Sequence, residues 1–143
     1  MVVDYRALNI YTVKNRTTLP LIGKILNRLS AAKIYTKLNL KDAYYRIRIR
    51  AGDKWKTAFR TRYGYYEFRV IPIGLVNMPA TFQLYINQAL IGLIDVSCII
   101  YLDDILVFSD NPEEYKCYIL EVLECLKATD LYINYNKYEF YTT

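Results

Sequence analysis

Two adjacent carboxylates, Asp103 and Asp104, stand between two apolar runs of strand length in this chain of 143 residues. The run 98–102 precedes them and the run 105–108 follows, and both are rich in β-branched and aromatic residues. The pattern predicts a strand, a tight turn and a second strand. Charge repulsion and desolvation oppose the placement of two acids at the tip of a buried hairpin. A divalent cation would explain the pair, because Mg²⁺ takes carboxylate oxygens together with substrate phosphates. A plain turn is the alternative that these residues leave open, since Asp is a common turn residue.

The composition describes one folded domain. Hydrophobic residues make up 54% of the chain and charged residues 23%, which is typical of a globular protein. The net charge of +5 suits a polyanionic partner without requiring one. No apolar run approaches the roughly 20 residues that cross a membrane, so we expect no membrane partner. The three cysteines show no metal-binding or disulfide spacing, which favours an intracellular location.

The chain has no histidine and 16 tyrosines. Without histidine, serine-type catalytic triads and His-ligated zinc sites are nearly excluded. Any chemistry must therefore depend on carboxylates, metals and basic side chains.

Periodicity and turn residues predict the following elements. We expect an extended arm over residues 1–18, then a helix that begins at Thr18 with an apolar stripe formed by Ile22, Ile25, Leu26 and Leu29. Further helices are predicted over residues 79–91, with Phe82, Ile86 and Leu90 on the core face, and over residues 112–128, with Ile119, Leu120, Leu123 and Leu126 pointing inward. Strands are predicted at 34–40, at 45–50, in a hairpin around Gly64 (55–60 and 65–70), in the Asp103–Asp104 hairpin, and as a final pair (131–135 and 138–141). This order predicts an α+β domain, a mainly antiparallel sheet covered on one face by helices.

Six segments also match a known family in the family's order. They are residues 3–9 (VDYRALN), 38–44 (LNLKDAY), 56–61 (KTAFRT), 72–83 (PIGLVNMPATFQ), 101–104 (YLDD) and 137–140 (KYEF). With these motifs the chain resembles the reverse transcriptase domain of gypsy-type LTR retrotransposons, over essentially its whole length. The resemblance implies a polymerase palm with part of the fingers, and residues 1–143 as a single fragment of a pol polyprotein. We expect the thumb and the RNase H domain to be absent from it.

The resemblance implies roles for individual residues. Asp103 matches a metal-binding and catalytic aspartate, with Asp104 beside it, and together with the position of Asn39 they would hold two Mg²⁺ (or Mn²⁺) ions. Asp42 matches a position whose backbone N–H meets the nucleotide triphosphate, and Tyr44 the ring under the nucleotide sugar that excludes a 2′-hydroxyl. The segment 72–83, which includes Ile73, Gly74 and Gln83, matches the stretch along template and nucleotide. For Arg6 and for the arginines at 46, 48 and 50, a phosphate-facing role and a structural surface role remain open.

The implied partners are an RNA or DNA template–primer and deoxynucleotide triphosphates. The implied location is the cytoplasm, a virus-like particle or the nucleus, and the oligomeric state is open.

The most important departure from the family is Asn39, where the family has aspartate. Asparagine keeps a carbonyl oxygen but loses the negative charge, so it is a poorer ligand for a divalent cation. Tyr45 and Tyr66 stand where histidine is usual, and Asp130 where glycine would suit a left-handed helix cap. Each of these changes is one C-to-T or G-to-A transition in a codon. Our hypothesis is a decayed copy: an RNA-directed DNA polymerase domain by descent, impaired at Asn39. The alternative is a non-catalytic nucleic-acid-binding remnant or a non-functional retrotransposon fragment.

Overall fold

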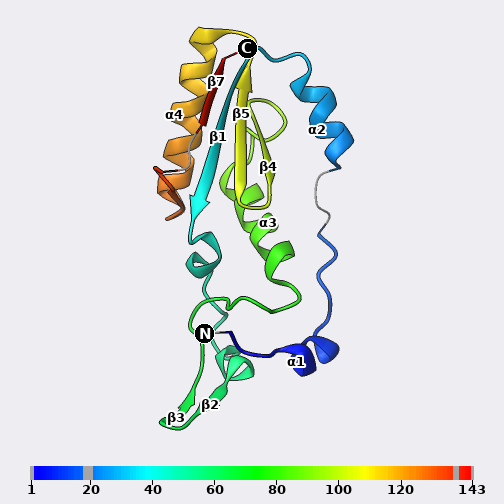
Figure 1. Ribbon diagram of the computed structural model, residues 1–143, viewed down its shortest axis with the longest axis vertical. Coiled ribbons are helices and arrows are strands. Elements are labelled where there is room, and N and C mark those ends of the chain that lie inside the picture. Colours follow the sequence, from blue (N-terminus) through cyan, green and yellow to red (C-terminus); the bar gives the residue numbers. More distant parts are fainter. Residues whose placement is uncertain (1, 18–20, 137–138, 143) are drawn as a thin grey trace.

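The computed structural model describes residues 2–17, 21–136 and 139–142 (Figure 1). The helices are α1 (Arg6–Tyr11), α2 (Ile22–Leu29), α3 (Met78–Ala89) and α4 (Pro112–Ala128), with short 3-10 helices η1 (Ala43–Arg46) and η2 (Lys54–Thr57). The strands are β1 (Ile34–Lys41), β2 (Phe59–Thr61), β3 (Gly64–Tyr66), β4 (Cys98–Tyr101), β5 (Asp104–Ser109), β6 (Tyr132–Ile133) and β7 (Glu139–Thr142). None of the helices in these ranges is both long enough and apolar enough to cross a membrane.

Five strands form one antiparallel sheet with β1 at its centre. The order is β4–β5–β1–β6. Strand β6 pairs with the end of β1, at Leu40–Lys41, and β7 pairs with its beginning, at Ile34–Lys37. The register of β1 against β5 places Ile34 opposite Ser109 and Asn39 opposite Asp104. The predicted α+β class is therefore confirmed.

One face of this sheet carries the hydrophobic core. Successive side chains point to opposite faces of a strand, and every second residue of β1 and β5 is buried. These buried residues are Thr36, Leu38, Leu40, Ile105, Val107 and Ser109. The helices α3 and α4 cover this face (Figure 1). Polar side chains can therefore lie on the opposite face, at the end of the sheet near the β4–β5 turn.

The two covering helices follow from their sequence signals. Phe82, Ile86 and Leu90 are fully buried, which confirms the predicted core face of α3. On α4, Leu126 is buried but Leu120 is 61% exposed, so the prediction that Leu120 points inward is wrong. The buried position is Val122, because the inward stripe of α4 falls on 115, 118, 119, 122 and 126 at helical spacing.

Three other predicted elements differ from the structure. The arm over residues 1–18 contains α1. The predicted strand 45–50 is a 3-10 turn followed by one bridge, Arg48 to Val70, because β1 ends at Lys41 and no neighbouring strand in the described chain extends a ladder there. The final two strands pair with β1 instead of with each other. The edge of β1 that β5 does not occupy is open to both, with β6 at Leu40–Lys41 and β7 at Ile34–Lys37.

Helix α2 exists as predicted from Ile22 onward, but residues 18–20 lie outside the described residues. Its apolar stripe is only partly covered: Ile22 and Leu26 are about three-fifths exposed. The hairpin β2–β3 is confirmed with shorter strands than expected, and it lies at the end of the long axis opposite β7 (Figure 1).

The end of α4 generates a stability prediction. The N–H groups of Asp130 and Leu131 donate to the carbonyls of Lys127 and Leu126, which forms a complete left-handed cap. Asp130 has φ +56°, a conformation that glycine adopts without a Cβ penalty. Asp130→Gly is therefore expected to raise the free energy of unfolding by about 1 kcal/mol, seen as a rise of a few degrees in Tm by calorimetry.

The matched control is Asp110→Gly, an exposed acid without a positive φ, which should leave Tm unchanged or lower it. A Tm for Asp130→Gly at or below that of the parent chain would show that the cap is not strained.

Candidate active site

The site is built on the turn between β4 and β5. The turn residues are Leu102 and Asp103, and Asp104 is the first residue of β5. Leu102 has φ +54°, which is strained for a residue with a branched side chain. The turn is held because the Asp103 carbonyl accepts the Leu40 N–H at 3.0 Å. The strain thus lies at the point where the two carboxylates meet β1, as is common at functional sites.

The Asn39 side chain faces Asp104 across the β1–β5 ladder. Its Nδ2 donates to Asp104 Oδ1 at 2.8 Å. The amide must present its NH₂ group here, because a carboxylate oxygen only accepts hydrogen bonds. The second Asp104 oxygen, Oδ2, lies 2.9 Å from Lys37 Nζ. Both oxygens of Asp104 are therefore engaged by donors from β1.

Asp103 has a different environment. Its Oδ1 is buried and accepts no hydrogen bond within the described chain. Burial, a hydrogen bond to Asp103 and the negative charge of Asp103 raise the pKa of Tyr44 to about 12. The Tyr44 phenol is protonated at neutral pH, as an ordinary tyrosine is, and can act as a donor. Its ring packs on Phe82 with the centroids 4.7 Å apart.

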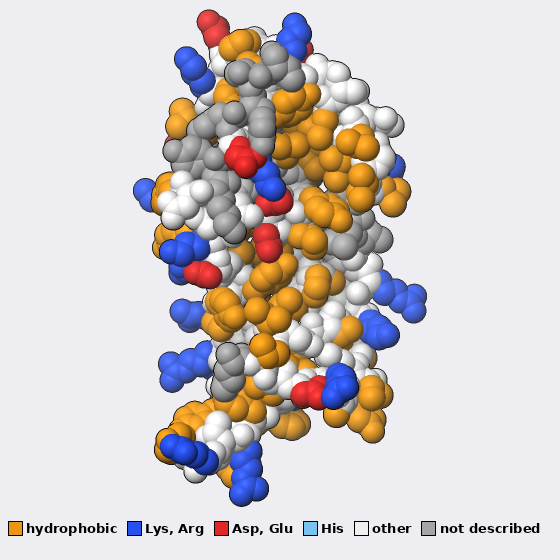
Figure 2. Space-filling model, viewed as in Figure 1, with side chains coloured by type: hydrophobic (Ala, Val, Ile, Leu, Met, Phe, Trp, Pro, Cys, Tyr) orange, Lys and Arg blue, Asp and Glu red, His pale blue; other side chains and the backbone are white. Residues whose placement is uncertain are grey.

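These groups form a small charged area on the open face of the sheet. Figure 2 shows red and blue side chains adjoining one another over the sheet, with hydrophobic side chains to the right of them and below. Beside Lys37 and Asp104 lies a hollow of about 180 Å³, bordered by Ile25 of α2 and by Tyr101.

The donor set fits a divalent cation in part. A buried carboxylate oxygen without a partner is a position that a cation would satisfy, and Asp103 Oδ1 is such an atom. To bind a cation with both of its oxygens, Asp104 would have to lose its ion pair with Lys37 and its hydrogen bond from Asn39. No group of three acidic, cysteine or histidine side chains in the described parts of the chain converges on a common point. Asp103 is therefore the residue that would hold a cation here, with Asp104 as a weaker contributor.

The other residues singled out by the resemblance are placed as follows. Asp42 is the N-cap of η1, with φ +51°, and is exposed. Ile73 is about half exposed, and Gly74 has φ +110° with its carbonyl accepting a hydrogen bond from Asn9 Nδ2 at 2.8 Å. Asp42 immediately precedes the turn that carries Tyr44, so these two belong to one local unit.

Two of the expected residues are engaged elsewhere. Gln83 is 1% exposed inside α3, where its Nε2 donates to Asn87 at 2.9 Å and its Oε1 has no partner in the described chain. The side chain of Arg6 pairs with Asp4 at 2.6 Å and lowers the pKa of Asp4 to about 2. Within the described chain, no hydrogen bond or ion pair joins either side chain to the carboxylate turn.

Sequence reasoning did not find Lys37. A signal was present, because Lys37 and Asn39 are two positions apart on a strand and must share a face. A lysine on the same strand face as a polar residue that lies opposite an acid predicts an ion pair of this kind.

Comparisons with known proteins identify the family and the fold. A family model described as reverse transcriptase (RNA-dependent DNA polymerase) matches residues 1–143. The Tf2-3 transposon polyprotein of Schizosaccharomyces pombe is 43% identical over 141 residues, which are 99% of this chain, and the Tf2-7 polyprotein is 42% identical. The chain spans 11% of the length of these relatives.

Solved structures share the fold. A foamy viral protease–reverse transcriptase in complex with an RNA/DNA hybrid superimposes with a TM-score of 0.85 at 23% identity, over 96% of this chain and 18% of that one. Another foamy viral protease–reverse transcriptase structure, in complex with ds DNA, superimposes with a TM-score of 0.86 at 23% identity. The match covers 96% of this chain and 24% of that one. The antiparallel sheet with helices on one face is thus a polymerase palm.

The Lys37–Asp104 ion pair generates a prediction. A divalent cation must compete with the ammonium group, so Lys37→Met should strengthen Mn²⁺ binding. The side chains are about two-fifths exposed, and an exposed pair contributes at most about 1 kcal/mol, so the expected gain is roughly two- to fivefold. Isothermal titration calorimetry measures it.

Lys41→Met, at the exposed end of the same strand, removes the same charge without touching Asp104 and should change the affinity much less. Equal gains in Mn²⁺ affinity for Lys37→Met and Lys41→Met would mean that the Lys37–Asp104 ion pair does not weaken cation binding at the site.

Proposed function

Because the chain belongs to the reverse transcriptase (RNA-dependent DNA polymerase) family, we propose that it is the palm and part of the fingers of a gypsy-type LTR retrotransposon enzyme, within a longer polyprotein. The retrotransposon assignment is supported by the identity to the Tf2 polyproteins and by the order of the six motifs. In this proposal its ancestral activity is RNA-directed DNA synthesis on a template–primer from deoxynucleotide triphosphates.

The observation that carries the proposal is the convergence of Asn39, Asp103 and Asp104 at one end of the sheet. In the two-metal scheme of nucleotidyl transfer, the ions stabilise the attacking and leaving oxygens. Asp103 would hold an ion, with Asp104 beside it as a weaker contributor. Tyr44, packed on Phe82, would present its ring to the sugar, and Asp42 its backbone N–H to the triphosphate. Ile73 and Gly74 would border the template and nucleotide.

We further propose that this copy is impaired at Asn39. An aspartate there would add a third carboxylate, whereas the NH₂ group of the asparagine donates a hydrogen bond to Asp104. The site then carries two negative charges, one of them offset by Lys37. Since about 1.4 kcal/mol makes a tenfold difference in rate, the absence of one good metal ligand is expected to lower turnover by orders of magnitude.

A nucleic-acid-binding protein without polymerase activity is the second candidate, and the engagement of Asp104 by Asn39 and Lys37 favours it. In either case we place the protein inside the cell. Its three cysteines are free, as in a reducing compartment.

The substitution Asn39→Asp tests the proposal directly. Without divalent cations it replaces a hydrogen bond by repulsion from Asp104, so the free energy of unfolding should fall by about 1 kcal/mol. Mg²⁺ should restore that stability. The Mg²⁺ affinity should rise at least about tenfold, the change that 1.4 kcal/mol makes in an equilibrium constant. Calorimetric titration and denaturation with and without Mg²⁺ give both values.

Asn27→Asp is the matched control, because it makes the same charge change on the exposed surface of α2. For activity, the Asn39 and Asp versions are grafted into a full-length relative and compared by primer extension. Robust extension by the Asn39 graft would contradict impairment at this position.

A further inference from the structure

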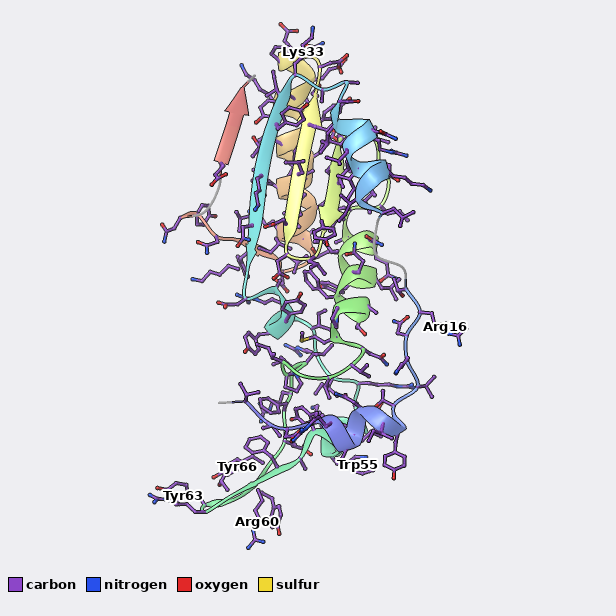
Figure 3. All side chains as sticks on the ribbon, turned by 45° about the vertical axis from the view of Figure 1, so that its right-hand side comes forward. Arg16, Lys33, Trp55, Arg60, Tyr63 and Tyr66 are labelled. Carbon is purple, nitrogen blue, oxygen red and sulfur yellow. The ribbon has the colours of Figure 1, made fainter. Side chains whose placement is uncertain are left out.

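A hollow opens at the outer edge of the sheet, between α2 and α3. Strand β4 is the last strand on this side of the sheet. Helix α2 lies beside β4, and α3 approaches the same place from below (Figures 1 and 3). The hollow has a volume of about 680 Å³, within the range of roughly 300–1,000 Å³ that is typical of small-molecule sites. Its size therefore fits a ligand much larger than water.

The walls of this hollow are mostly aliphatic. Leu21 and Ile25 line it from the side of α2, and Ile99 and Ile100 line it from β4. The two β4 residues are almost fully buried, whereas Leu21 is 66% exposed. The hollow thus runs from an open mouth at α2 to a buried inner wall at β4 and α3, and an apolar molecule would gain contact with both.

Gln83 of α3 forms part of the inner wall, and its side chain is incompletely hydrogen-bonded. It is 1% exposed, and its Nε2 donates to Asn87 Oδ1 at 2.9 Å. Its Oε1 has no hydrogen-bond partner in the described chain. A buried acceptor without a donor is costly, so such a group in a folded protein needs an explanation. A ligand with an N–H or O–H group at the inner end of the hollow would supply the missing donor.

The mouth of the hollow carries an excess of positive charge. Arg28 Nη1 lies 3.3 Å from Asp95 Oδ1 and donates to the Asp95 carbonyl at 2.5 Å, which links α2 to the turn before β4. Among the described residues, no carboxylate forms an ion pair with Lys24, the other cation of the lining. The ammonium group of Lys24 is therefore available to a ligand, and it favours an anion over a cation.

We propose that this hollow binds a small organic acid. The apolar body of the acid packs against the leucine and isoleucine side chains, an N–H or O–H group donates to Gln83 Oε1, and the carboxylate lies at the mouth beside Lys24. Largely apolar walls with a few convergent polar groups are the usual make-up of a small-molecule site. The residues that carry this proposal lie outside the carboxylate turn, so it does not depend on polymerase activity.

The competing explanation is an ordered water molecule that donates to Gln83 Oε1. A water occupies about 30 Å³ and needs two to four polar partners, so it would fill little of the hollow and meet few polar groups on aliphatic walls. This explanation predicts that no larger molecule binds, and a binding measurement separates the two.

The experiment titrates the ¹⁵N-labelled chain with indole-3-acetate and follows its amide signals by NMR. This probe has an apolar ring system, one N–H donor and one carboxylate. The amide signals of Gln83, Ile99 and Ile100 should shift, with a Kd of about 1 mM or lower, as expected for a ligand of this size. The analogue 1-methylindole-3-acetate lacks the donor and should bind at least about tenfold more weakly. Tryptamine, with an ammonium group in place of the carboxylate, should also bind more weakly.

Two variants test the polar contacts separately. Gln83→Leu removes the buried acceptor and should weaken indole-3-acetate binding at least about tenfold. Lys24→Gln removes an exposed charge and should weaken it about two- to fivefold. The matched controls are Gln88→Leu, on the exposed surface of the same helix, and Lys14→Gln, which is exposed and outside the lining. Both controls should bind the probe as the parent chain does.

Three results would overturn the proposal. The first is the absence of shifts at Gln83, Ile99 and Ile100 up to the solubility limit of indole-3-acetate, which is the outcome that a bound water predicts. The second is equal affinity for the methylated analogue. The third is parental affinity in a folded Gln83→Leu variant. The comparison of the two indole acids uses the unaltered chain, so it decides the question even if Gln83→Leu fails to fold.

Discussion

The register between β1 and β5 is the constraint on which the site depends. Because Leu38 and Leu40 must face α3 and α4, Asn39 must face the open side. Pairing with Asp104 then follows, since a slip by one residue would turn a carboxylate into the core. The same ladder ties the strained turn at Leu102 to β1 through the Asp103 carbonyl. The hydrophobic face of the sheet thus fixes the positions of the polar groups on the other.

That constraint gives the two adjacent acids unequal environments. Asp104 is the first residue of β5 and lies within reach of two donors on β1, Lys37 and Asn39. Asp103 lies in the turn with a buried oxygen that lacks a partner in the described chain, next to Tyr44. A single change from aspartate to asparagine in an ancestor would therefore do more than remove one charge. It would also supply a hydrogen-bond donor that holds Asp104 in place without a metal.

Much of this arrangement could be predicted from the sequence, because the relevant signals are local. The YLDD hairpin and helix α4 follow from alternation and helical periodicity, and the left-handed Asp130 follows from the resemblance, which implies glycine at that position. The errors lie where tertiary contacts decide. The inward face of α4 includes Val122 and not Leu120. Strands β6 and β7 pair with β1 instead of with each other, and Lys37 forms an ion pair with Asp104. The metal roles of Asp103 and Asp104 stay predictions.

The number of divalent ions that the chain binds tests the central claim most directly. Titration with Mn²⁺, followed by electron paramagnetic resonance of the free ion, counts the bound ions per chain. With Asn39 in place, the account predicts no more than one ion, lost in Asp103→Asn and largely retained in Asp104→Asn. Two ions per chain, or an ion that depends on Asp104 and not on Asp103, would contradict the account.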